Sequence, residues 1–511
     1  MNSRKLLIPL AAAGALLLAA CSGGDSVDIG GSGSGSSGGD QVLVAAIASE
    51  PDQLDPHKTS AYASFEVLEN VYDTLVEPDE NLEMQPALAE SWDLSDDQLT
   101  WTFHLRDGVS FTDGAALTAE DVAYSYNRII DDELSPSWRF SAVTSVKATD
   151  DKTVVIKVSA PTPNLLTLIG GYKGLAIVEK SNVESGDITR APVGTGPFSV
   201  AEWTSGDHIT LKANPDYWGG APKLSGVEFR FISEGSTALT ALSGGEIQWT
   251  DSIPVQKVAS LQSDDSLELA TAPSNDYQYL SLNEEHAPWD DPRARQAVAY
   301  AIDRDAIVQA ATSGTGVLNQ LAIPQESAWY TAYDTYSLDQ QKAQDLFDEV
   351  GYTGGTVNYL ATSDYPETGK IGQILADNLE PYGIKVKIRT VDFATWLDEQ
   401  GAGKFDAYSL SWIGNLDPDE FYYSQHHTDG SFNFQHYSNP EVDKLLDAAR
   451  TETDTDTRKQ QYADAATQIA DDASYIYLYN PAVIQAWAPS VQGYTARSDR
   501  AIRFRDVSLS S

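Results

Sequence analysis

The chain alternates irregularly between strand-like and helix-like segments over about 470 residues, and this alternation most limits the folds open to it. The segment LTWTFHLR (99–106) alternates apolar and polar residues as a half-buried strand does, and TVVIKV from Thr153 predicts a second strand. Between them, LTAEDVAYSYNRII predicts a helix with Thr118 as N-cap and Asp121 completing a capping box. Mixed elements of this length predict α/β or α+β architecture in two or three domains.

The later half of the chain carries further helix signals. Asp291 is the expected N-cap of DDPRARQAVAYAIDRDAIV, with Pro292 in its first turn. The amphipathic segment SLDQQKAQDLFDEVGY is expected to end at Gly351. SNPEVDKLLDAAR and TRKQQYADAATQIADD also have helical patterns, and SYIYLYNPAVIQAW predicts a return to strand.

The N-terminus predicts export and lipid attachment. Arg4 and Lys5 precede the apolar run LLIPLAAAGALLLAA, which is shorter than the roughly 20 residues of a membrane span. The run ends in LLAAC, which resembles a bacterial lipobox and makes Cys21 the expected lipid attachment site. An ordinary secretory peptide cut at an Ala-x-Ala site is the alternative. We therefore expect a lipoprotein signal peptide over 1–20 and a flexible Gly/Ser tether over 21–40.

Charge and cysteine content exclude several functions. The formal net charge is −42, and the acidic residues are dispersed rather than gathered in one block, which predicts a solvated acidic surface. Nucleic acid and anionic lipid require a basic face, so we expect neither as a partner. Cys21 is the only cysteine, which excludes an intramolecular disulfide.

Four stretches in order resemble one protein family, the extracytoplasmic solute-binding proteins of the dipeptide/oligopeptide/nickel importer class, family 5. They are LAESWDLSDDQLTWTFHLRDGVSFTDGAALTAEDVAYSYNRI, GTGPFSVAEWTSGDHITLKANPDYWGGAPKLSGVEFRF, DPRARQAVAYAIDRDAIV and SLSWIGNLDPDEF. The resemblance implies an α/β, two-lobed clamp of the periplasmic-binding-protein type (class II, large type). It also implies a monomer that is not an enzyme, needs no cofactor and delivers its ligand to ABC permease subunits.

In this family the chain crosses between lobes, so a lobe is not one continuous segment. The resemblance implies a first lobe of 41–78, 190–274 and 483–511, with an extra subdomain over 79–189. The second lobe would span 275–482. A ligand would bind between the lobes and favour their closed state through contacts made only there.

The segment SWIGNLDP is the first candidate ligand site. Trp412 is the expected stacking wall. Peptide-binding relatives carry an Asp three residues after this Trp, which pairs with the peptide amine. Here Asn415 stands at that position, and Asp417 is the nearby carboxylate that could take the role. Dipeptide relatives also place an Arg in the region matching TSDYPETG, where this chain has Asp364.

Tyrosines complete the expected ligand wall. Tyr277 and Tyr279 alternate with Gln278 and so share one face of a strand. Tyr477, in YIYLYN, and Tyr62, on a loop after the first strand, are further candidates. We expect a short peptide or a similarly sized polar solute. An oligosaccharide, an opine-like compound and a nickel chelate remain alternatives.

Two other functions can be weighed on the same region. His426, His427 and His436 could bind a metal, but no C-x-x-C or H-E-x-x-H spacing accompanies them, so we expect a surface or structural role and no metal.

A hydrolase would need two carboxyls flanking a scissile bond, such as Asp417 with Asp419 or Glu420. Acids on a DPDE turn are more often caps and solvated charges, which favours a binding protein over an enzyme.

Overall fold

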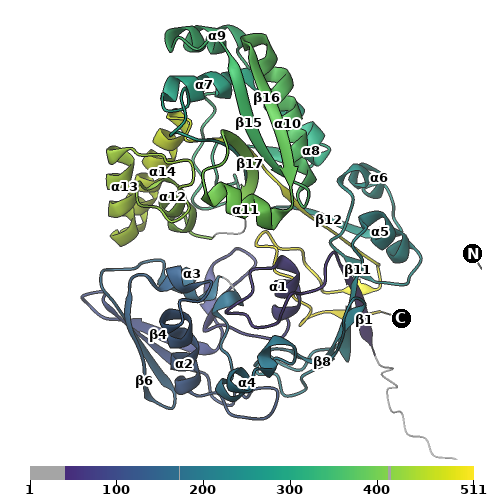
Figure 1. The fold of residues 1–511 in the computed structure, drawn as a ribbon. Coiled ribbons are helices and arrows are strands. Elements are labelled where there is room, and N and C mark those ends of the chain that lie inside the picture. Colours follow the sequence, from purple (N-terminus) through teal and green to yellow (C-terminus); the bar gives the residue numbers. More distant parts are fainter. Residues whose placement is uncertain (1–40, 172, 413–415, 511) are drawn as a thin grey trace, which may run out of the picture. The chain divides into compact units, whose positions relative to one another are not determined.

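The computed structural model describes residues 41–171, 173–412 and 416–510. Among these residues the strands form two large mixed sheets, one four-stranded antiparallel sheet and two short strand pairs (Figure 1). The predicted lipid site Cys21 and the candidate Asn415 lie outside the described residues, so both stay predictions.

The first large sheet has seven strands and draws them from distant parts of the chain. In spatial order they are β12 (Glu268–Pro273), β19 (Ala482–Trp487), β11 (Trp249–Thr250), β1 (Val42–Ile47), β10 (Gly226–Phe231), β9 (His208–Ala213) and β8 (Phe198–Thr204). β1 runs parallel to both of its neighbours, β10 and β11, and the other neighbouring pairs are antiparallel.

Both faces of this sheet are covered, because β1 is apolar on both sides. Leu43 and Ala45 point into a core shared with Phe229, whereas Ala46 packs with Leu242 in a second core. The helices of this region are α1 (Tyr62–Leu68), α4 (Lys180–Ser185), α5 (Gly235–Ser243) and α6 (Val258–Leu261). Residues of α1 join the first core, and residues of α5 and α6 join the second.

The four-stranded sheet has the order β4 (Ala89–Leu94), β5 (Thr100–Leu105), β7 (Thr153–Val158), β6 (Val143–Asp150). It packs with α2 (Ala119–Asp131) and α3 (Leu165–Gly170) around its own apolar core. The predicted capping box is confirmed, since the Thr118 backbone N–H donates to Asp121 Oδ2 at 2.9 Å.

The second large sheet has six strands. In spatial order they are β14 (Val317–Leu318), β18 (Tyr475–Asn480), β13 (Tyr277–Leu282), β17 (Ala407–Trp412), β15 (Gly355–Thr362) and β16 (Ile384–Val391). β15 is parallel to β16 and β17, and the remaining pairs are antiparallel. On β13, Leu280 and Leu282 enter one core, and Tyr277 and Tyr279 share the opposite face and enter another, as their alternation predicts.

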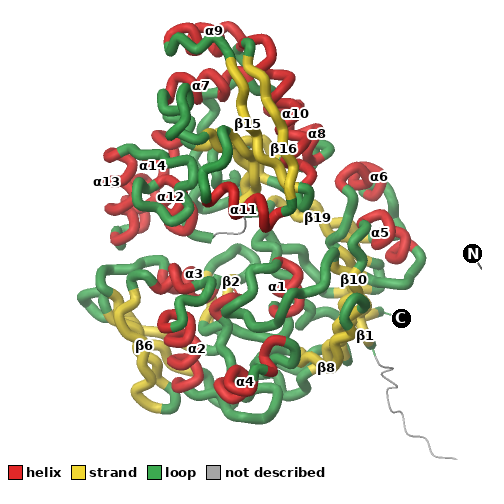
Figure 2. The backbone as a smooth tube through the Cα atoms, in the orientation of Figure 1, coloured by secondary structure: helices red, strands yellow, loops and turns green. Residues whose placement is uncertain are grey.

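Eight helices among the described residues accompany the second sheet. They are α7 (Pro292–Ala301), α8 (Arg304–Thr312), α9 (Gln340–Glu349), α10 (Pro366–Leu379), α11 (Phe393–Gly401), α12 (Asp419–His426), α13 (Pro440–Thr451) and α14 (Thr455–Asp471). α10 lies along β15 and β16, and α12, α13 and α14 form one group (Figure 2).

The helix starts expected from the sequence are confirmed in this region. Asp291 caps α7 by accepting from the Arg293 N–H at 2.9 Å, and Gly351 after α9 has φ +67°. The segment after Asp291 forms two helices, because Ile302 is extended and Asp303 caps α8.

The remaining elements are short. They are β2 (Val76–Pro78), β3 (Met84–Pro86), β20 (Val491–Gln492), β21 (Ser508–Leu509) and the 3₁₀ turns η1 (Ser137–Phe140), η2 (Lys173–Leu175), η3 (Asp187–Thr189), η4 (Val255–Lys257) and η5 (Glu380–Tyr382). In the described part of the chain, we find no helix with the length and apolar character that crossing a membrane requires.

Candidate functional site

Along the described residues the chain passes between the two large sheets twice, and the two passages lie side by side. The first is 274–276, between β12 and β13, and the second is Pro481, between β18 and β19. Ser274 Oγ donates to the Pro481 carbonyl oxygen at 2.6 Å, and Asn480 Nδ2 donates to the Asp276 carbonyl oxygen at 2.8 Å. Two short, adjacent connections suit a hinge, because only a few backbone torsions need to change.

Arg500 reaches this crossing from the C-terminal segment. Its Nη1 donates to Asp276 Oδ2 at 2.9 Å, and its guanidinium lies 4.8 Å from the centre of the Tyr62 ring. The Tyr62 hydroxyl donates to the Arg500 carbonyl oxygen at 3.3 Å. Arg500 has φ +61°, a left-handed conformation that is uncommon for a residue with a long side chain. Such a conformation persists only where the surrounding contacts hold it, and it often marks a functional position.

The charge of Arg500 opposes the raised pKa of two more carboxyl groups. Glu66 lies one helical turn after Tyr62 on α1, and Asp251 follows β11. Burial raises the pKa of Glu66, and so do the charge of Asp251 and a hydrogen bond between the two carboxyls. Burial also raises the pKa of Asp251. Together with Asp276 these residues form a set that we call the Arg500 cluster: Tyr62, Glu66, Asp251, Asp276 and Arg500.

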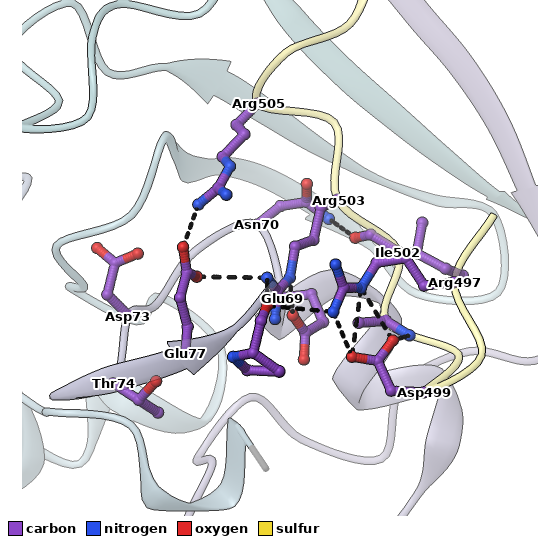
Figure 3. Close-up of polar contacts among 12 residues, drawn as sticks. Glu69, Asn70, Asp73, Thr74, Glu77, Arg497, Asp499, Ile502, Arg503 and Arg505 are labelled. Carbon is purple, nitrogen blue, oxygen red and sulfur yellow. Dashed lines mark hydrogen bonds and ion pairs between the residues drawn. The ribbon is translucent and has the colours of Figure 1, made fainter. Parts of the chain in front are cut away.

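Ion pairs fix the backbone before and after Arg500, and Figure 3 shows these pairs. Before it, Arg497 pairs with Asp499 at 2.6 Å. After it, Arg503 pairs with Glu69 of the α1 C-terminus at 3.0 Å. The Arg503–Glu69 pair binds the C-terminal segment to the helix that also supplies Tyr62 and Glu66. Arg497 adds a hydrogen bond from its Nη2 to the Asp79 carbonyl oxygen at 2.9 Å.

A second set of contacts holds the same segment. Asn70 Nδ2 donates to the Ile502 carbonyl oxygen at 2.9 Å, and its Oδ1 accepts from the Phe504 N–H at 2.9 Å. Arg505 donates to Glu77 Oε1 at 2.6 Å (Figure 3). Burial raises the pKa of Glu77, but the surrounding cations outweigh it and lower the value to about 2. The pairing therefore stays ionised at neutral pH.

The predicted aromatic residues fall into two places. Tyr277, Tyr279 and Tyr477 are buried together, with ring centres 5.9 Å apart for Tyr277–Tyr279 and 5.5 Å apart for Tyr277–Tyr477. Trp412, at the end of β17, is opposite Tyr277 in the strand register and is half-buried. Tyr62 belongs to the Arg500 cluster, and the expected loop position is wrong, because Tyr62 is the first residue of helix α1. Their contact with a ligand stays a prediction.

Asp417 lies in a different environment. Both of its carboxylate oxygens accept from Arg458, each at 2.7 Å, and Oδ1 also accepts from the Asp419 N–H at 3.0 Å. The expected capping role is confirmed. The expectation that the DPDE acids are solvated is wrong, because Asp417, Asp419 and Glu420 are all buried. Arginine side chains neutralise them, with Arg450 pairing to Asp419 at 3.1 Å.

The same acids contact the region of the four-stranded sheet. Arg139 of η1 pairs with Glu420 at 3.0 Å, and both side chains are buried. Asn164 Nδ2 donates to Asp417 Oδ1 at 3.3 Å. Burial raises the pKa of Glu420 to about 7, with Asp417 adding to the shift and Arg139 opposing it. These contacts tie α12 to the extra subdomain expected from the sequence.

The histidines of this region are engaged in separate contacts. His426 is buried, with Nδ1 3.0 Å from Ser474 Oγ and Nε2 3.1 Å from the Tyr477 hydroxyl. Burial lowers the pKa of His426 to about 3, so its ring is neutral. His427 and His436 approach different carboxylates, at 3.5 Å each. Over the described ranges no group of three potential ligands is arranged to hold a metal ion.

Two of the cavities among the described residues have volumes of about 300 Å³, and neither coincides with the predicted site. One lies beside the crossing and includes Thr271, Asn480 and Pro481 in its wall. The other is at the edge of the second sheet and includes Lys387 and Arg389. None of the predicted ligand residues that the structure describes lines either of these two cavities.

Sequence reasoning missed four members of the Arg500 cluster: Glu66, Asp251, Asp276 and Arg500. One signal was available for Arg500. The segment RSDRAIRFRD (497–506) has four arginines within nine residues, in a chain with only 33 lysines and arginines against 75 acidic residues. No comparable signal marks the carboxyls, which are ordinary members of a large acidic population.

Two mixed sheets joined by adjacent crossings, with a charged cluster at the crossing, define a solute-binding protein of the periplasmic type. Residues 83–433 match the family model described as bacterial extracellular solute-binding proteins, family 5 Middle. The chain belongs to this family, whose members are extracytoplasmic substrate-binding proteins of ABC importers.

Similar proteins cover nearly the whole chain. It is 30% identical over 476 residues to the probable D,D-dipeptide-binding periplasmic protein DdpA of Escherichia coli strain K12, covering 89% of this chain and 91% of that protein. It is 29% identical over 481 residues to the glutathione-binding protein GsiB of Pectobacterium atrosepticum, covering 91% and 94%. Among solved structures, DppA of Helicobacter pylori in complex with the peptide STSA has a TM-score of 0.82 at 28% identity, covering 92% and 98%.

Replacing Glu420 with Gln should remove a pH-dependent loss of stability. The pKa of Glu420 rises from an ordinary 4.5 to about 7 on folding, so the folded state holds this proton more tightly than the unfolded state. Its contribution to stability therefore falls as pH rises from 4.5 to 7, by roughly 3 kcal/mol in total. Urea unfolding at several pH values should show that the free energy of unfolding of E420Q increases relative to that of the wild type as pH rises across this window.

The exposed Glu90 on β4 supplies the control, because E90Q removes one carboxyl without touching a buried pair. The free energy of unfolding of the wild type minus that of E420Q should therefore change with pH. A difference that stays constant with pH would contradict the buried, proton-retaining state of Glu420.

Proposed function

We propose that the protein captures a short peptide or a similarly sized polar solute between two lobes and delivers it to ABC permease subunits. The lobes are those expected from the sequence, and the paired crossings at 274–276 and Pro481 serve as the hinge. Ligand binding favours a closed arrangement by making contacts with both lobes at once.

The observation that carries this proposal is the unused hydrogen-bonding capacity of Arg500. A guanidinium has five N–H donors in a planar fork that matches a carboxylate. Among the described residues only the Asp276 side chain accepts from this guanidinium, and 37% of the Arg500 side chain is exposed. A ligand carboxylate could therefore bind here without displacing a protein partner, as a peptide C-terminus would.

The relatives support a peptide ligand. The names of DdpA and GsiB specify a D,D-dipeptide and glutathione, and DppA was solved with a tetrapeptide. Each of these compounds carries a carboxylate and an ammonium group. An oligosaccharide, an opine-like compound or a nickel chelate would be a different outcome of the experiment below.

The remaining features of the proposal concern location and chemistry. We place the protein at the outer face of the cell membrane, held by a lipid on Cys21 through the Gly/Ser tether, and working as a monomer. It releases its ligand unchanged. The buried acids near Asp417 that a hydrolase would use are neutralised by arginines, which favours a structural role for them.

Native mass spectrometry of the purified protein tests the ligand class. We expect a co-purified mass of a peptide of a few residues, released on denaturation and sequenced by fragmentation. Incubation with trialanine should give a one-to-one complex and leave the peptide intact. A bound sugar or metal chelate without peptide would overturn the peptide assignment, and cleavage of trialanine would overturn the binding function.

Replacing Trp412 with Ala tests the predicted ligand wall. If stacking contributes more than about 1.4 kcal/mol, trialanine affinity measured by calorimetry should fall at least about tenfold. Trp329 is the matched control, because it is also half-buried against the same aromatic core but contacts Tyr462 and Arg458 instead. Unchanged affinity in W412A, with a lowered melting temperature, would assign Trp412 to the core.

A further inference from the structure

The cavity at the edge of the second sheet, which we call the sheet-edge cavity, extends over three neighbouring strands. These are β16, β15 and β17, which lie side by side (Figure 1). Asn358 and Leu360 of β15 line the cavity, and they point to one face of the sheet because they alternate along the strand. Lys387 and Arg389 of β16 stand next to them in the strand register. The described residues that line this cavity include no member of the Arg500 cluster or of the crossing.

Cationic side chains converge on the sheet-edge cavity from three separate parts of the chain. Lys387 and Arg389 come from β16. Lys404 comes from the loop between α11 and β17, and His286 from the segment between β13 and α7. Among the described residues in the wall, Asp406 is the only acidic one. The charge gathered here is therefore opposite in sign to the net charge of the chain, which is −42.

The two lysines have no partner for their charge. The ammonium groups of Lys387 and Lys404 make no hydrogen bond or ion pair with a described residue, and both side chains are exposed. Arg389 pairs with Glu399 through Nη2, which leaves further N–H donors on its guanidinium. The cavity thus offers three cationic groups, and two of them lack an anion.

Asp406 does not neutralise the lysines, because other groups occupy both of its carboxylate oxygens. Oδ1 lies 2.9 Å from His286 Nδ1, and Oδ2 accepts from the backbone N–H and from Nδ2 of Asn358, each at 2.7 Å. The Asp406 N–H also donates to the Asn358 carbonyl oxygen at 3.0 Å. These contacts fix the loop that carries Lys404 against β15, so the cations are positioned before any ligand arrives.

Protection of the sheet edge does not account for this arrangement. Lysines on an edge strand discourage pairing with other chains, and Lys385, Lys387 and Arg389 share one face of β16 in this way. That role requires neither Lys404 nor His286, which lie outside the strands, and it requires no cavity. Convergence of cations from three segments on one cavity instead favours a bound anion.

We propose that the sheet-edge cavity binds a phosphate group, either as inorganic phosphate or as the phosphate of a small soluble ester. Such a group carries about −1.5 to −2 charges near pH 7 and several strong acceptor oxygens, which suits two unpaired ammonium groups and the remaining donors of Arg389. The cavity volume of about 300 Å³ is at the lower end for small-molecule sites and therefore fits a compact compound. The inference goes beyond the proposed function, because this site does not use the crossing.

Calorimetry on the purified protein tests the proposal, with inorganic phosphate and glycerol 3-phosphate as probes at constant ionic strength in Hepes buffer. We expect saturable one-to-one binding with a Kd of about 1 mM or tighter, and acetate should bind at least about tenfold more weakly. In K387Q and in K404Q the affinity for both phosphates should fall about tenfold, the value of one charge-assisted hydrogen bond.

Lys385 is the matched control, because it lies on the same face of β16, is exposed and does not line the cavity. K385Q removes the same charge and should keep the wild-type affinity to within about twofold. All three variants should melt within about 2 °C of the wild type, since each alters an exposed side chain. Heats that do not saturate, or an equal loss of affinity in K385Q and K387Q, would show general attraction to a charged face and would overturn the site.

Vesicle sedimentation separates a soluble phosphate from a lipid headgroup. Retention on phosphatidylglycerol vesicles should be the same for the wild type and for K387Q, so that any lipid on the protein contributes equally to both. Retention that K387Q abolishes, in a protein that does not bind glycerol 3-phosphate, would assign the cavity to the membrane surface and overturn the soluble ligand.

A competition arm keeps this result distinct from the proposed function. The affinity for trialanine should be the same with and without saturating phosphate, because the two sites share no residue among those described. Phosphate that displaces trialanine would place the anion at the crossing and overturn the sheet-edge site. Binding of phosphate by a protein that does not bind trialanine would support this site and reject the peptide ligand.

Discussion

The ion pair between Arg500 and Asp276 is the contact on which the rest of the site depends. Asp276 lies in the crossing that leads into β13, and Arg500 belongs to the C-terminal segment that packs against α1. The pair thus connects the backbone of the hinge with the first sheet region. Arg500 keeps φ +61°, a conformation with an energetic cost that the surrounding contacts must offset. The residues on either side of it supply such contacts, and Figure 3 shows their ion pairs and the Asn70 hydrogen bond to Ile502.

The Arg500–Asp276 pair is significant because basic side chains are scarce in this chain. The chain has 33 basic side chains against 75 acidic ones, and several arginines are placed in buried pairs that hold elements together. Arg128 with Asp55, Arg139 with Glu420 and Arg458 with Asp417 are of this kind, with both partners at most 8% exposed at the side chain. Removing one partner of such a pair leaves a buried charge, which is costly, so these arginines are committed to structure. Arg500 differs because its side chain is partly exposed and, among the residues that the structure describes, its guanidinium donates only to Asp276.

Local sequence signals predicted much of the fold and part of the site. Thr118, Asp121 and Asp291 form their capping contacts with residues only two or three positions away, so these caps could be recognised from the sequence. The alternation of Tyr277 and Tyr279 correctly predicted that they share one face of a strand. The burial of the DPDE acids could not be predicted, because Arg458 and Arg139 approach Asp417 and Glu420 from 41 and 281 positions away. The Arg500–Asp276 pair spans 224 positions. Long-range pairs of common residue types leave no pattern in a single sequence. The resemblance to a family predicted the fold but did not predict these pairs.

A crystal structure of the protein with trialanine bound would test the central claim most directly. We expect the peptide at the crossing between the two sheet regions, with its carboxylate within hydrogen-bond distance of the Arg500 guanidinium, about 2.7–3.2 Å. Arg500 should keep its left-handed backbone and its contact with Asp276. A peptide bound elsewhere, with Arg500 contacting only Asp276 and Tyr62, would contradict the assignment of Arg500 as the ligand anchor.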